Sequence, residues 1–202
     1  MAANLLQELI HALQCLPGVG PKSAQRMAFQ LLERERDKGL LLADTIKYAL
    51  KNIDRCDQCR TFTELNTCEL CTSPRRKRSQ LCIVESPADV FALEQTNSYQ
   101  GVYFVLMGRL SPLDGIGPKD IGIDLLTTRI NQNEITEMII ATNPTIEGEA
   151  TAHYLANLVK DKQIKTSRLA TGIPAGGELE YIDQLTLSRA FQARVLLSPE
   201  TA

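Results

Sequence analysis

The 202-residue sequence predicts an α/β protein in which a helical hairpin unit and a cysteine module precede a parallel sheet. Three observations lead to this fold class. Two runs of helical periodicity are joined by a Gly/Pro turn near the N-terminus, two C-x2-C pairs follow, and short apolar strands then alternate with helices. Such alternation is typical of a parallel sheet with helices packed on its faces.

Composition indicates a globular protein with an uneven charge distribution. Hydrophobic residues make up 44% of the chain and charged residues 23%, as in globular domains. The net charge is −2, but residues 1–78 hold 13 Lys/Arg against 9 Asp/Glu, and residues 79–202 hold 9 against 15. We therefore expect the N-terminal part to meet a polyanion and the C-terminal part to meet a basic protein or a metal.

Neither a membrane nor a base-stacking surface is indicated. No apolar run approaches the length of a membrane span, and the first residues carry no basic leader with a cleavage site. We expect a cytoplasmic protein without a membrane partner. Trp is absent and aromatic residues are few, which disfavours a platform for stacking bases.

Residues 16–29, LPGVGPKSAQRMAF, predict a turn between two helices that can hold a phosphate. Gly18 and Gly20 permit positive φ angles and a close approach of the backbone to another surface. Pro21 suits the first position of a helix, whose free amides and positive dipole end then face an anion. Lys22 and Arg26 lie four residues apart on one helical face, so both reach the same anion. An ordinary helical hairpin explains the same residues about equally well.

Three helices are expected within residues 1–53. Asn4 caps the first helix, and the second follows the Gly/Pro turn. The alternating charges of residues 33–38 are typical of a solvated helix end, and Gly39 breaks the pattern, so the third helix is expected over residues 42–53. Because so short a unit has little core, we expect it to pack on another domain or on another copy of itself.

Four cysteines carry the strongest local signal in the sequence. Cys56, Cys59, Cys68 and Cys71 form two C-x2-C pairs separated by eight residues. This spacing predicts one tetrahedral zinc ion per chain, and four thiolates leave no position open for catalysis, so the zinc is structural. Disulfides are disfavoured in the cytoplasm. We expect Cys15 and Cys82, which lie outside this set, to be buried thiols.

A basic run, Arg75 to Arg78, follows the cysteines. It suits contacts with phosphates. It suits a solvated linker equally well, and the sequence does not separate the two.

From residue 81 onward, short apolar strands alternate with helices. We expect strands over residues 81–84, 102–106, 137–141 and 168–171, and helices over residues 87–95 and 146–160. Functional groups gather at the carboxyl ends of parallel strands. Glu85 ends the first strand, and Asn143, Glu147 and Glu149 follow the third. The long Gly/Pro-rich loop between the second and third strands is expected to be either an ordered functional loop or a flexible cover, and its length favours some function.

A second Gly/Pro loop begins at residue 171 and precedes a last helix. Such a loop suits a phosphate. The nearby acids Glu178, Glu180 and Asp183 make that use less attractive, since a helix start favours acids anyway.

Several unrelated segments, taken in order, resemble the bacterial recombination mediator family RecR. They are the hairpin LPGVGPKSAQRMAF, the four-cysteine cluster, LCIVES, LSPLDGIGPKDIG, ATNPTIEGEATA and TGIPAGGELEYID. The resemblance covers nearly the whole chain. Residues 103–108 depart from it, because they read YFVLMG where the family pattern is YHVLGG. The missing histidine and glycine argue against a fixed chemical role at those positions.

The resemblance implies four parts and a ring-shaped tetramer that encircles DNA. The parts are a helix–hairpin–helix domain over residues 1–53, a zinc module over 54–78, a Toprim domain with a Rossmann-like parallel sheet over 79–175, and a C-terminal loop and helix over 176–202. DNA binding falls to Gly18, Gly20, Lys22 and Arg26, of which the last two match positions that the family uses.

The resemblance also implies partners. The family acts in the cytoplasm, at the nucleoid, with RecO and in some settings RecF. This RecFOR pathway loads the recombinase RecA onto gapped DNA that is coated by single-strand-binding protein.

The alternative is a Toprim enzyme that transfers phosphoryl groups with magnesium. Such enzymes carry an Asp-x-Asp where this chain has Asn143 and Thr145, and neither residue is anionic. Glu85 and Glu147 would hold Mg²⁺ only weakly, and the chain has no room for a tyrosine-nucleophile domain. We therefore expect no catalysis. The four acids Glu85, Asp89, Glu147 and Glu149 are instead predicted to form an acidic patch that binds RecO, unless some of them merely cap helices.

Overall fold

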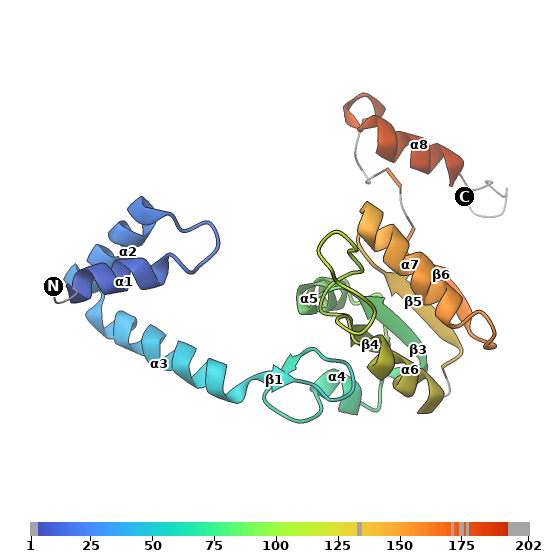
Figure 1. Ribbon diagram of the computed structural model, residues 1–202, viewed down its shortest axis with the longest axis horizontal. Helices are drawn as coiled ribbons and strands as arrows, with labels where there is room; N and C mark the ends of the chain where they lie inside the picture. Colours follow the sequence, from blue (N-terminus) through green and yellow to red (C-terminus); the bar gives the residue numbers. More distant parts are fainter. Residues whose placement is uncertain (1–3, 133–134, 171, 174–175, 177, 194–202) are drawn as a thin grey trace. The chain divides into compact units, whose positions relative to one another are not determined.

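The computed structural model describes residues 4–132, 135–170, 172–173, 176 and 178–193, and it divides into two compact units, Met1–Ile53 and Asp54–Ala202 (Figure 1). The first unit is helical. The second contains the cysteine module, a four-stranded sheet and the C-terminal helix. Among the described helices, none has the length and apolar character that a membrane span requires.

The N-terminal unit contains three helices, as the periodicity predicts. They are α1 (Leu5–Leu13), α2 (Pro21–Glu33) and α3 (Arg36–Asn52). The Asn4 side chain accepts a hydrogen bond from the backbone N–H of Leu6 and so caps α1, as expected. Pro21 occupies the first turn of α2, with Gly20 as the N-cap.

The start of α3 differs from the expected one. The helix begins at Arg36 and continues through Gly39, whose N–H donates to the carbonyl of Glu35 at 2.8 Å. Lys38 also pairs with Glu35 at 2.8 Å. One glycine costs a helix only about 1 kcal/mol, which a helix of this length tolerates. The charged run therefore spans the end of α2 at Glu33 and the start of α3 at Arg36.

The core of the N-terminal unit is small. Ile10 of α1 packs with Ala24 and Ala28 of α2, supported by partly buried leucines of α1 and by Val19. Helix α3 buries none of its residues. Its large apolar side chains are exposed: Leu40, Leu41, Leu42, Ile46, Tyr48 and Leu50. The expectation of a unit with little core of its own is therefore confirmed for the isolated chain.

The second unit opens with short elements and continues as an alternating α/β fold. In chain order it contains β1 (Asp54–Arg55), β2 (Phe62–Thr63), α4 (Glu69–Thr72), β3 (Lys77–Val84), α5 (Pro87–Gln95), β4 (Gly101–Val105), α6 (Ile123–Gln132), β5 (Glu137–Ala141), α7 (Ile146–Leu158), β6 (Lys165–Arg168), the 3-10 turn η1 (Leu179–Tyr181) and α8 (Gln184–Gln192). Strands β1 and β2 form an antiparallel pair.

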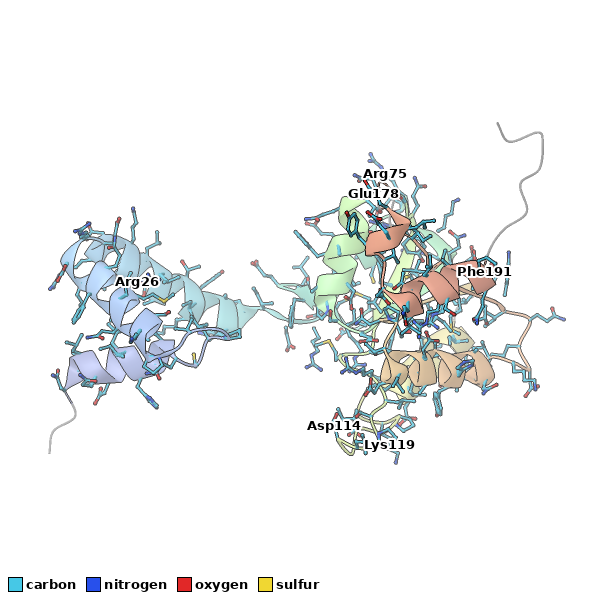
Figure 2. All side chains as sticks on the ribbon, turned by 90° about the horizontal axis from the view of Figure 1, so that it is seen from above. Arg26, Arg75, Asp114, Lys119, Glu178 and Phe191 are labelled. Atoms are coloured by element: carbon cyan, nitrogen blue, oxygen red, sulfur yellow. The ribbon has the colours of Figure 1, made fainter. Side chains whose placement is uncertain are left out.

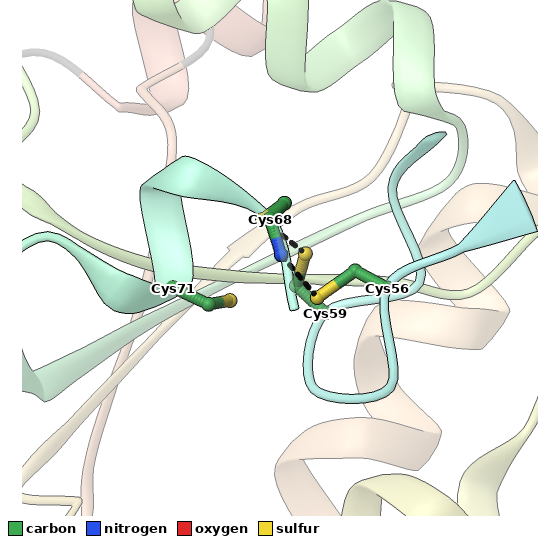
Figure 3. A group of neighbouring side chains, drawn as sticks. All are labelled: Cys56, Cys59, Cys68 and Cys71. Atoms are coloured by element: carbon green, nitrogen blue, oxygen red, sulfur yellow. Dashed lines mark hydrogen bonds between the residues drawn. The ribbon is translucent and has the colours of Figure 1, made fainter. Parts of the chain in front are cut away.

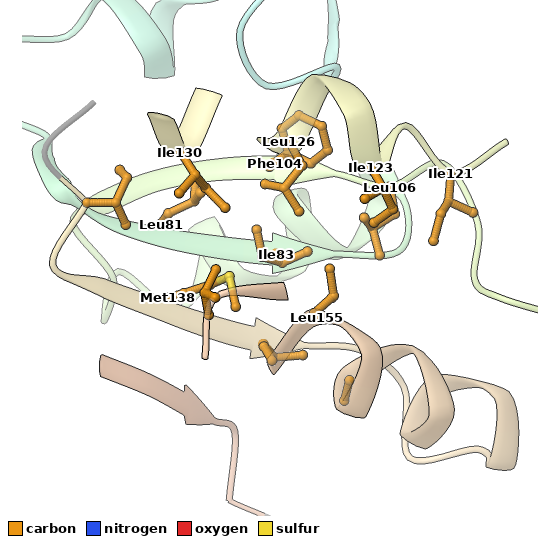
Figure 4. Packing of buried hydrophobic residues seen from close by; sticks show 14 of the residues in the cluster. Leu81, Ile83, Phe104, Leu106, Ile121, Ile123, Leu126, Ile130, Met138 and Leu155 are labelled. Carbon is orange, nitrogen blue, oxygen red and sulfur yellow. The ribbon is translucent and has the colours of Figure 1, made fainter. Parts of the chain in front are cut away.

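The main sheet is parallel and has the strand order β4-β3-β5-β6. Helix α5 packs on one face over Cys82, Val84 and Tyr103. Helices α6 and α7 cover the other face, where Ile83, Phe104, Leu126 and Leu155 belong to the largest core cluster (Figure 4). The predicted parallel sheet with helices on its faces is confirmed.

The sheet order sets the position of the functional site. The chain leaves β3 toward β4 on one side and returns to place β5 on the other side, so the connections diverge between β3 and β5. In open parallel sheets, ligands bind at the carboxyl ends of the strands at such a switch point. Glu85 directly follows β3, and Thr142 and Asn143 directly follow β5.

Several boundaries differ from the sequence predictions. Strand β3 starts at Lys77 rather than at residue 81, and β6 spans Lys165–Arg168 rather than 168–171. Helix α6 was not predicted, although Ile123, Leu126 and Ile130 give it a buried face. The β1–β2 pair and α4 were also missed, since elements of two to four residues leave no periodic pattern.

The long loop between β4 and α6 is ordered by its own hydrogen bonds. Ser111 and Ile116 exchange backbone hydrogen bonds at 3.1 and 2.9 Å, and the Ser111 hydroxyl donates to Asp114 at 2.6 Å. Asp114 and Lys119 mark the outer end of this loop (Figure 2). Of the two alternatives, an ordered loop and a flexible cover, these hydrogen bonds favour the ordered loop.

Candidate functional site

The turn between α1 and α2 leaves a helix start open to solvent. Gly18 has a φ of +78°, a conformation that side chains with a Cβ adopt reluctantly. The N–H of Val19 donates to the Leu16 carbonyl at 3.1 Å and closes the turn. Gly20 has no side chain with which to cap α2, and the first turn of α2 contains no acidic residue. Its free amides therefore stay available for an external anion.

Lys22 and Arg26 are exposed on α2, directly after this turn. Figure 2 labels Arg26. Within the described residues, no ion pair joins either cation to a carboxylate. A Cβ on Gly20 would meet no atom within 4 Å. The fold of the chain itself therefore does not demand a glycine at position 20.

The four cysteines of the two C-x2-C pairs form one buried cluster (Figure 3). Their Sγ atoms all lie within 4.8 Å of one another. The Sγ atoms of Cys59 and Cys68 are 3.4 Å apart, and the N–H of Cys68 donates to Cys56 Sγ at 3.3 Å. Thiolates around a tetrahedral zinc lie about 3.8 Å apart for Zn–S bonds of about 2.3 Å, so this donor set fits a metal ion.

The charge state of the cluster also suits a cation. Hydrogen bonds from Cys59 and Cys71 hold the pKa of Cys68 well below its usual range, whereas the hydrogen bond with Cys68 raises the pKa of Cys59, so the cluster without a metal favours one thiolate. A buried thiolate needs compensation, and a bound dication supplies it. Cys82 is buried as predicted, but Cys15 is exposed, so the prediction for Cys15 was wrong. It lies just after α1, on the solvent side of the turn.

Two arginines fix the cysteine module to the sheet domain. Arg60 donates from Nη1 to the carbonyls of Leu106 and Ile121 at 3.1 and 2.7 Å. Arg129 of α6 donates to the carbonyls of Gln58 and Tyr103. These hydrogen bonds hold the cysteine module against β4 and against the segment that connects β4 with α6. Sequence reasoning missed both residues, because nothing local distinguishes them from surface arginines.

At the switch point, Glu85 is engaged by Asn143. Glu85 is only 6% exposed, and its two carboxylate oxygens accept from the backbone N–H and the side-chain Nδ2 of Asn143, both at 2.8 Å. Arg109 approaches the same carboxylate at 3.9 Å. Gly148 permits this close packing, since a Cβ there would lie 2.0 Å from the Asn143 carbonyl oxygen.

The other three predicted acids lie close to this point but differ in their partners. Asp89 belongs to a capping box with Ser86 at the start of α5. Glu149 pairs with Arg168 and, at 3.7 Å, with Arg189, and the hydrogen bond from Arg168 lowers its pKa. Among the described residues, no ion pair engages Glu147, which lies in the first turn of α7.

Thr145 occupies the second position where Toprim enzymes carry an aspartate. Its side chain accepts from the N–H of Gly148 at 3.1 Å and caps α7. Both substituted positions therefore have a structural role in this chain. Asn143 holds Glu85, and Thr145 holds the start of α7.

The last predicted site is the C-terminal Gly/Pro loop. Thr171, Pro174, Ala175 and Gly177 lie outside the described residues. Asp183 beyond the loop accepts from the N–H of Thr186 and caps α8. Asp183 therefore serves a helix start, whereas Glu178 makes no side-chain cap at η1.

Comparison with known protein families gives three matches along the chain. The Toprim domain matches residues 79–170, the helix-hairpin-helix of RecR matches residues 6–50, and the C-terminal region of RecR matches residues 172–195. Together with the parallel sheet and the four-cysteine cluster, these matches define a Toprim-domain protein with an appended helix-hairpin-helix and a metal-binding module.

This combination is the domain architecture of one family. The chain belongs to the RecR family. Its domains support a role in DNA recombination and repair, and the family suggests DNA binding and oligomerisation.

Proposed function

We propose that this chain is a non-catalytic DNA clamp of recombinational repair. It acts with RecO, and in some settings with RecF, to load RecA onto gapped DNA that is coated by single-strand-binding protein. The observation that carries this proposal is the open helix start of α2, with Gly18, Gly20, Lys22 and Arg26 around it.

The hairpin supplies a weak contact that repetition strengthens. Free amides, a helix dipole and two cations that pair with no carboxylate of the described residues suit one or two backbone phosphates. So few contacts give a weak and salt-sensitive site. A ring tetramer presents four copies to the same DNA and raises avidity without new chemistry.

The Toprim domain serves as a binding surface rather than as an enzyme. Magnesium prefers several hard anionic oxygens, whereas Asn143 and Thr145 are neutral at the two aspartate positions. The carboxylate of Glu85 already accepts two hydrogen bonds from Asn143. We expect neither magnesium binding nor phosphoryl transfer at this site.

The acidic patch binds RecO. Glu147 is its most available member, because among the described residues no ion pair engages it, whereas Asp89 caps α5, Glu149 pairs with Arg168 and Glu85 is buried. A basic surface on RecO matches the negative balance of this part of the chain. The four cysteines hold a structural zinc ion, one per chain, because a closed set of four thiolates selects zinc.

Loading of RecA onto gapped, coated DNA tests the proposal. The chain together with RecO should accelerate RecA assembly, and Glu147→Lys should weaken RecO binding while DNA binding persists. Lys160→Glu, at an exposed position of the same unit, is the control for a change of charge. Unchanged RecO affinity in Glu147→Lys would show that the acidic patch does not bind RecO. Failure of the unaltered chain to accelerate RecA assembly would contradict the proposal as a whole.

A further inference from the structure

Three arginines from separate segments line one cavity of the second unit. The cavity has a volume of about 390 Å³ and is lined by Arg60 of the cysteine module, Arg78 of β3 and Arg129 of α6. Asp57 is the one carboxylate among the described lining residues. We call this site the arginine cavity.

Arg60 brings a buried positive charge to the arginine cavity. It is 9% exposed, donates only to backbone carbonyls in the contacts given above, and lies 5.6 Å from the centre of the Phe104 ring. Within the described residues, no ion pair joins Arg60 to a carboxylate. A buried charge in this position gains free energy from an anion.

Arg78 adds a second charge that remains accessible. It is exposed, and its Nη2 donates to the carbonyl of Cys71 at 3.1 Å, which leaves its other N–H donors for a ligand. Gln58, Thr128 and Gln132 supply neutral polar groups to the lining. Apolar residues make up the rest of the wall, and a wall of low polarity strengthens the attraction between opposite charges.

The arginines of the basic run Arg75 to Arg78 have three different environments. Arg76 is used inside the fold, where it pairs with Glu94. Arg75 is exposed and does not line the arginine cavity (Figure 2). Arg78 does line it.

We propose that the arginine cavity binds a phosphate of the DNA backbone, as a DNA contact additional to the hairpin. The inference rests on the proposed function, since it assumes that DNA is the polyanion that this chain meets. The guanidinium groups of Arg60 and Arg78 are planar donors that suit phosphate oxygens. No aromatic face is exposed there for a base, because Phe104 is buried, so the contact reads the backbone and not the sequence.

The metal module positions this site. Arg60 directly follows Cys59, its φ is +65°, and its N–H donates to the Cys56 carbonyl at 2.8 Å. The same loop supplies Asp57 and Gln58 to the lining. Binding of the metal therefore fixes the guanidinium at the cavity.

Binding of a short labelled single-stranded oligonucleotide to the full zinc-loaded chain, over a series of salt concentrations, tests the inference. Each phosphate contact contributes about 0.7 to the slope of log K against log salt for single strands. Arg78→Gln should reduce the slope by about this amount, while Arg75→Gln, a matched change in the same basic run, should leave it near the wild-type value. Equal slopes in Arg78→Gln and wild type, or equal losses in both variants, would overturn the inference.

A second variant avoids removing an arginine. Thr128→Glu adds a carboxylate to the lining and should compete with a phosphate, whereas Gln163→Glu adds the same charge at an exposed position outside the cavity. Only the first should weaken oligonucleotide binding. Equal binding by the two variants would count against the arginine cavity.

Competition experiments identify the anion. Pyrophosphate should displace the oligonucleotide from wild type more effectively than from Arg78→Gln. An oligoglutamate peptide that binds more tightly than the oligonucleotide, and does so through Arg78, would assign the cavity to an acidic protein and overturn the DNA contact. A wild-type chain that binds no DNA would instead contradict the proposed function, so the two failures are distinguishable.

Discussion

At the residue scale, one residue determines the chemistry of the hairpin and one determines that of the switch point. Gly20 leaves the first turn of α2 without a side-chain cap. Asn143 donates two hydrogen bonds to the buried carboxylate of Glu85, whose oxygens are then less available as metal ligands. Gly20→Ser adds a side-chain cap to α2, and Asn143→Asp removes the side-chain donor to Glu85, each with little change in volume.

Gly20→Ser should stabilise the protein and weaken DNA binding. A serine hydroxyl at the N-cap accepts from the amides of the first turn, and this raises the free energy of unfolding by a few tenths of a kcal/mol. The same amides are then lost to a phosphate. Urea unfolding and oligonucleotide affinity measure the two effects. Gly39→Ser in α3 is the control and should leave affinity intact. Undiminished affinity in Gly20→Ser would show that these amides do not contact DNA.

Asn143→Asp should destabilise the protein at neutral pH by about 2 kcal/mol, because a second carboxylate then lies against the buried carboxylate of Glu85. Like charges raise the pKa of such a pair above its value in the unfolded chain. The destabilisation is therefore full above the raised pKa and declines as the pH falls through it.

Thermal unfolding of Asn143→Asp at pH 7 and pH 5, with Asn143→Ala as the uncharged control, measures this dependence. Mg²⁺ should raise the melting temperature of Asn143→Asp and leave that of the wild type unchanged. A comparable rise in the melting temperature of the wild type would show that the Toprim site binds Mg²⁺ as it stands, against our proposal.

At the element scale, the cysteine module is held together by its metal site and is attached to the sheet domain by two arginines. Its β1–β2 pair and α4 are too short to persist alone, and Arg60 and Arg129 connect it to carbonyls of the main domain. The metal should therefore stabilise more of the molecule than the loop that holds it.

Metal analysis should give one zinc per chain, and removal of zinc by a chelator should lower the melting temperature by several degrees. Cys59→Ser should have the same effect, because three thiolates hold zinc less firmly than four. Cys82→Ser is the control for a buried cysteine outside the cluster, and it should keep the full zinc content. Full metal content in Cys59→Ser would contradict the assignment of the ligands.

Elements with long periodic patterns were predictable from sequence, and elements fixed by distant contacts were not. Helix α5 and strand β5 were predicted with their observed limits, since a proline or a continuous apolar run defines each. The start of α3 was missed because one glycine costs a helix too little to end it. Helix α6 was missed because its buried face packs on the sheet only in the folded chain, after a long Gly/Pro loop. The cysteine cluster was evident from spacing, whereas Arg60 and Asn143 acquire their roles only where separate segments meet.

At the scale of the whole molecule, α3 presents more apolar surface than a solitary unit explains. None of its residues is buried, and Leu50 is 81% exposed. Exposed apolar surface of this extent marks an interface between proteins. The family suggests oligomerisation, and we infer that α3 contributes to it.

Leu50→Glu should therefore reduce the mass of the protein in solution, measured by light scattering or sedimentation. Lys47→Glu alters an exposed polar position of the same helix and should not reduce it. Loss of the oligomer should also weaken DNA binding, because avidity depends on several hairpins. An unchanged mass in Leu50→Glu would place the interface elsewhere.

The central claim is that repeated hairpins hold DNA through Lys22 and Arg26, and the salt dependence of DNA affinity tests it most directly. The slope of log K against log salt should be compared for wild type and for Lys22→Ala/Arg26→Ala, with the mass of each measured under the same conditions. We predict that the double variant keeps the oligomer and loses most of its affinity and slope, since each phosphate contact on duplex DNA contributes about 0.9. An intact oligomer that binds DNA with the wild-type slope would contradict the claim.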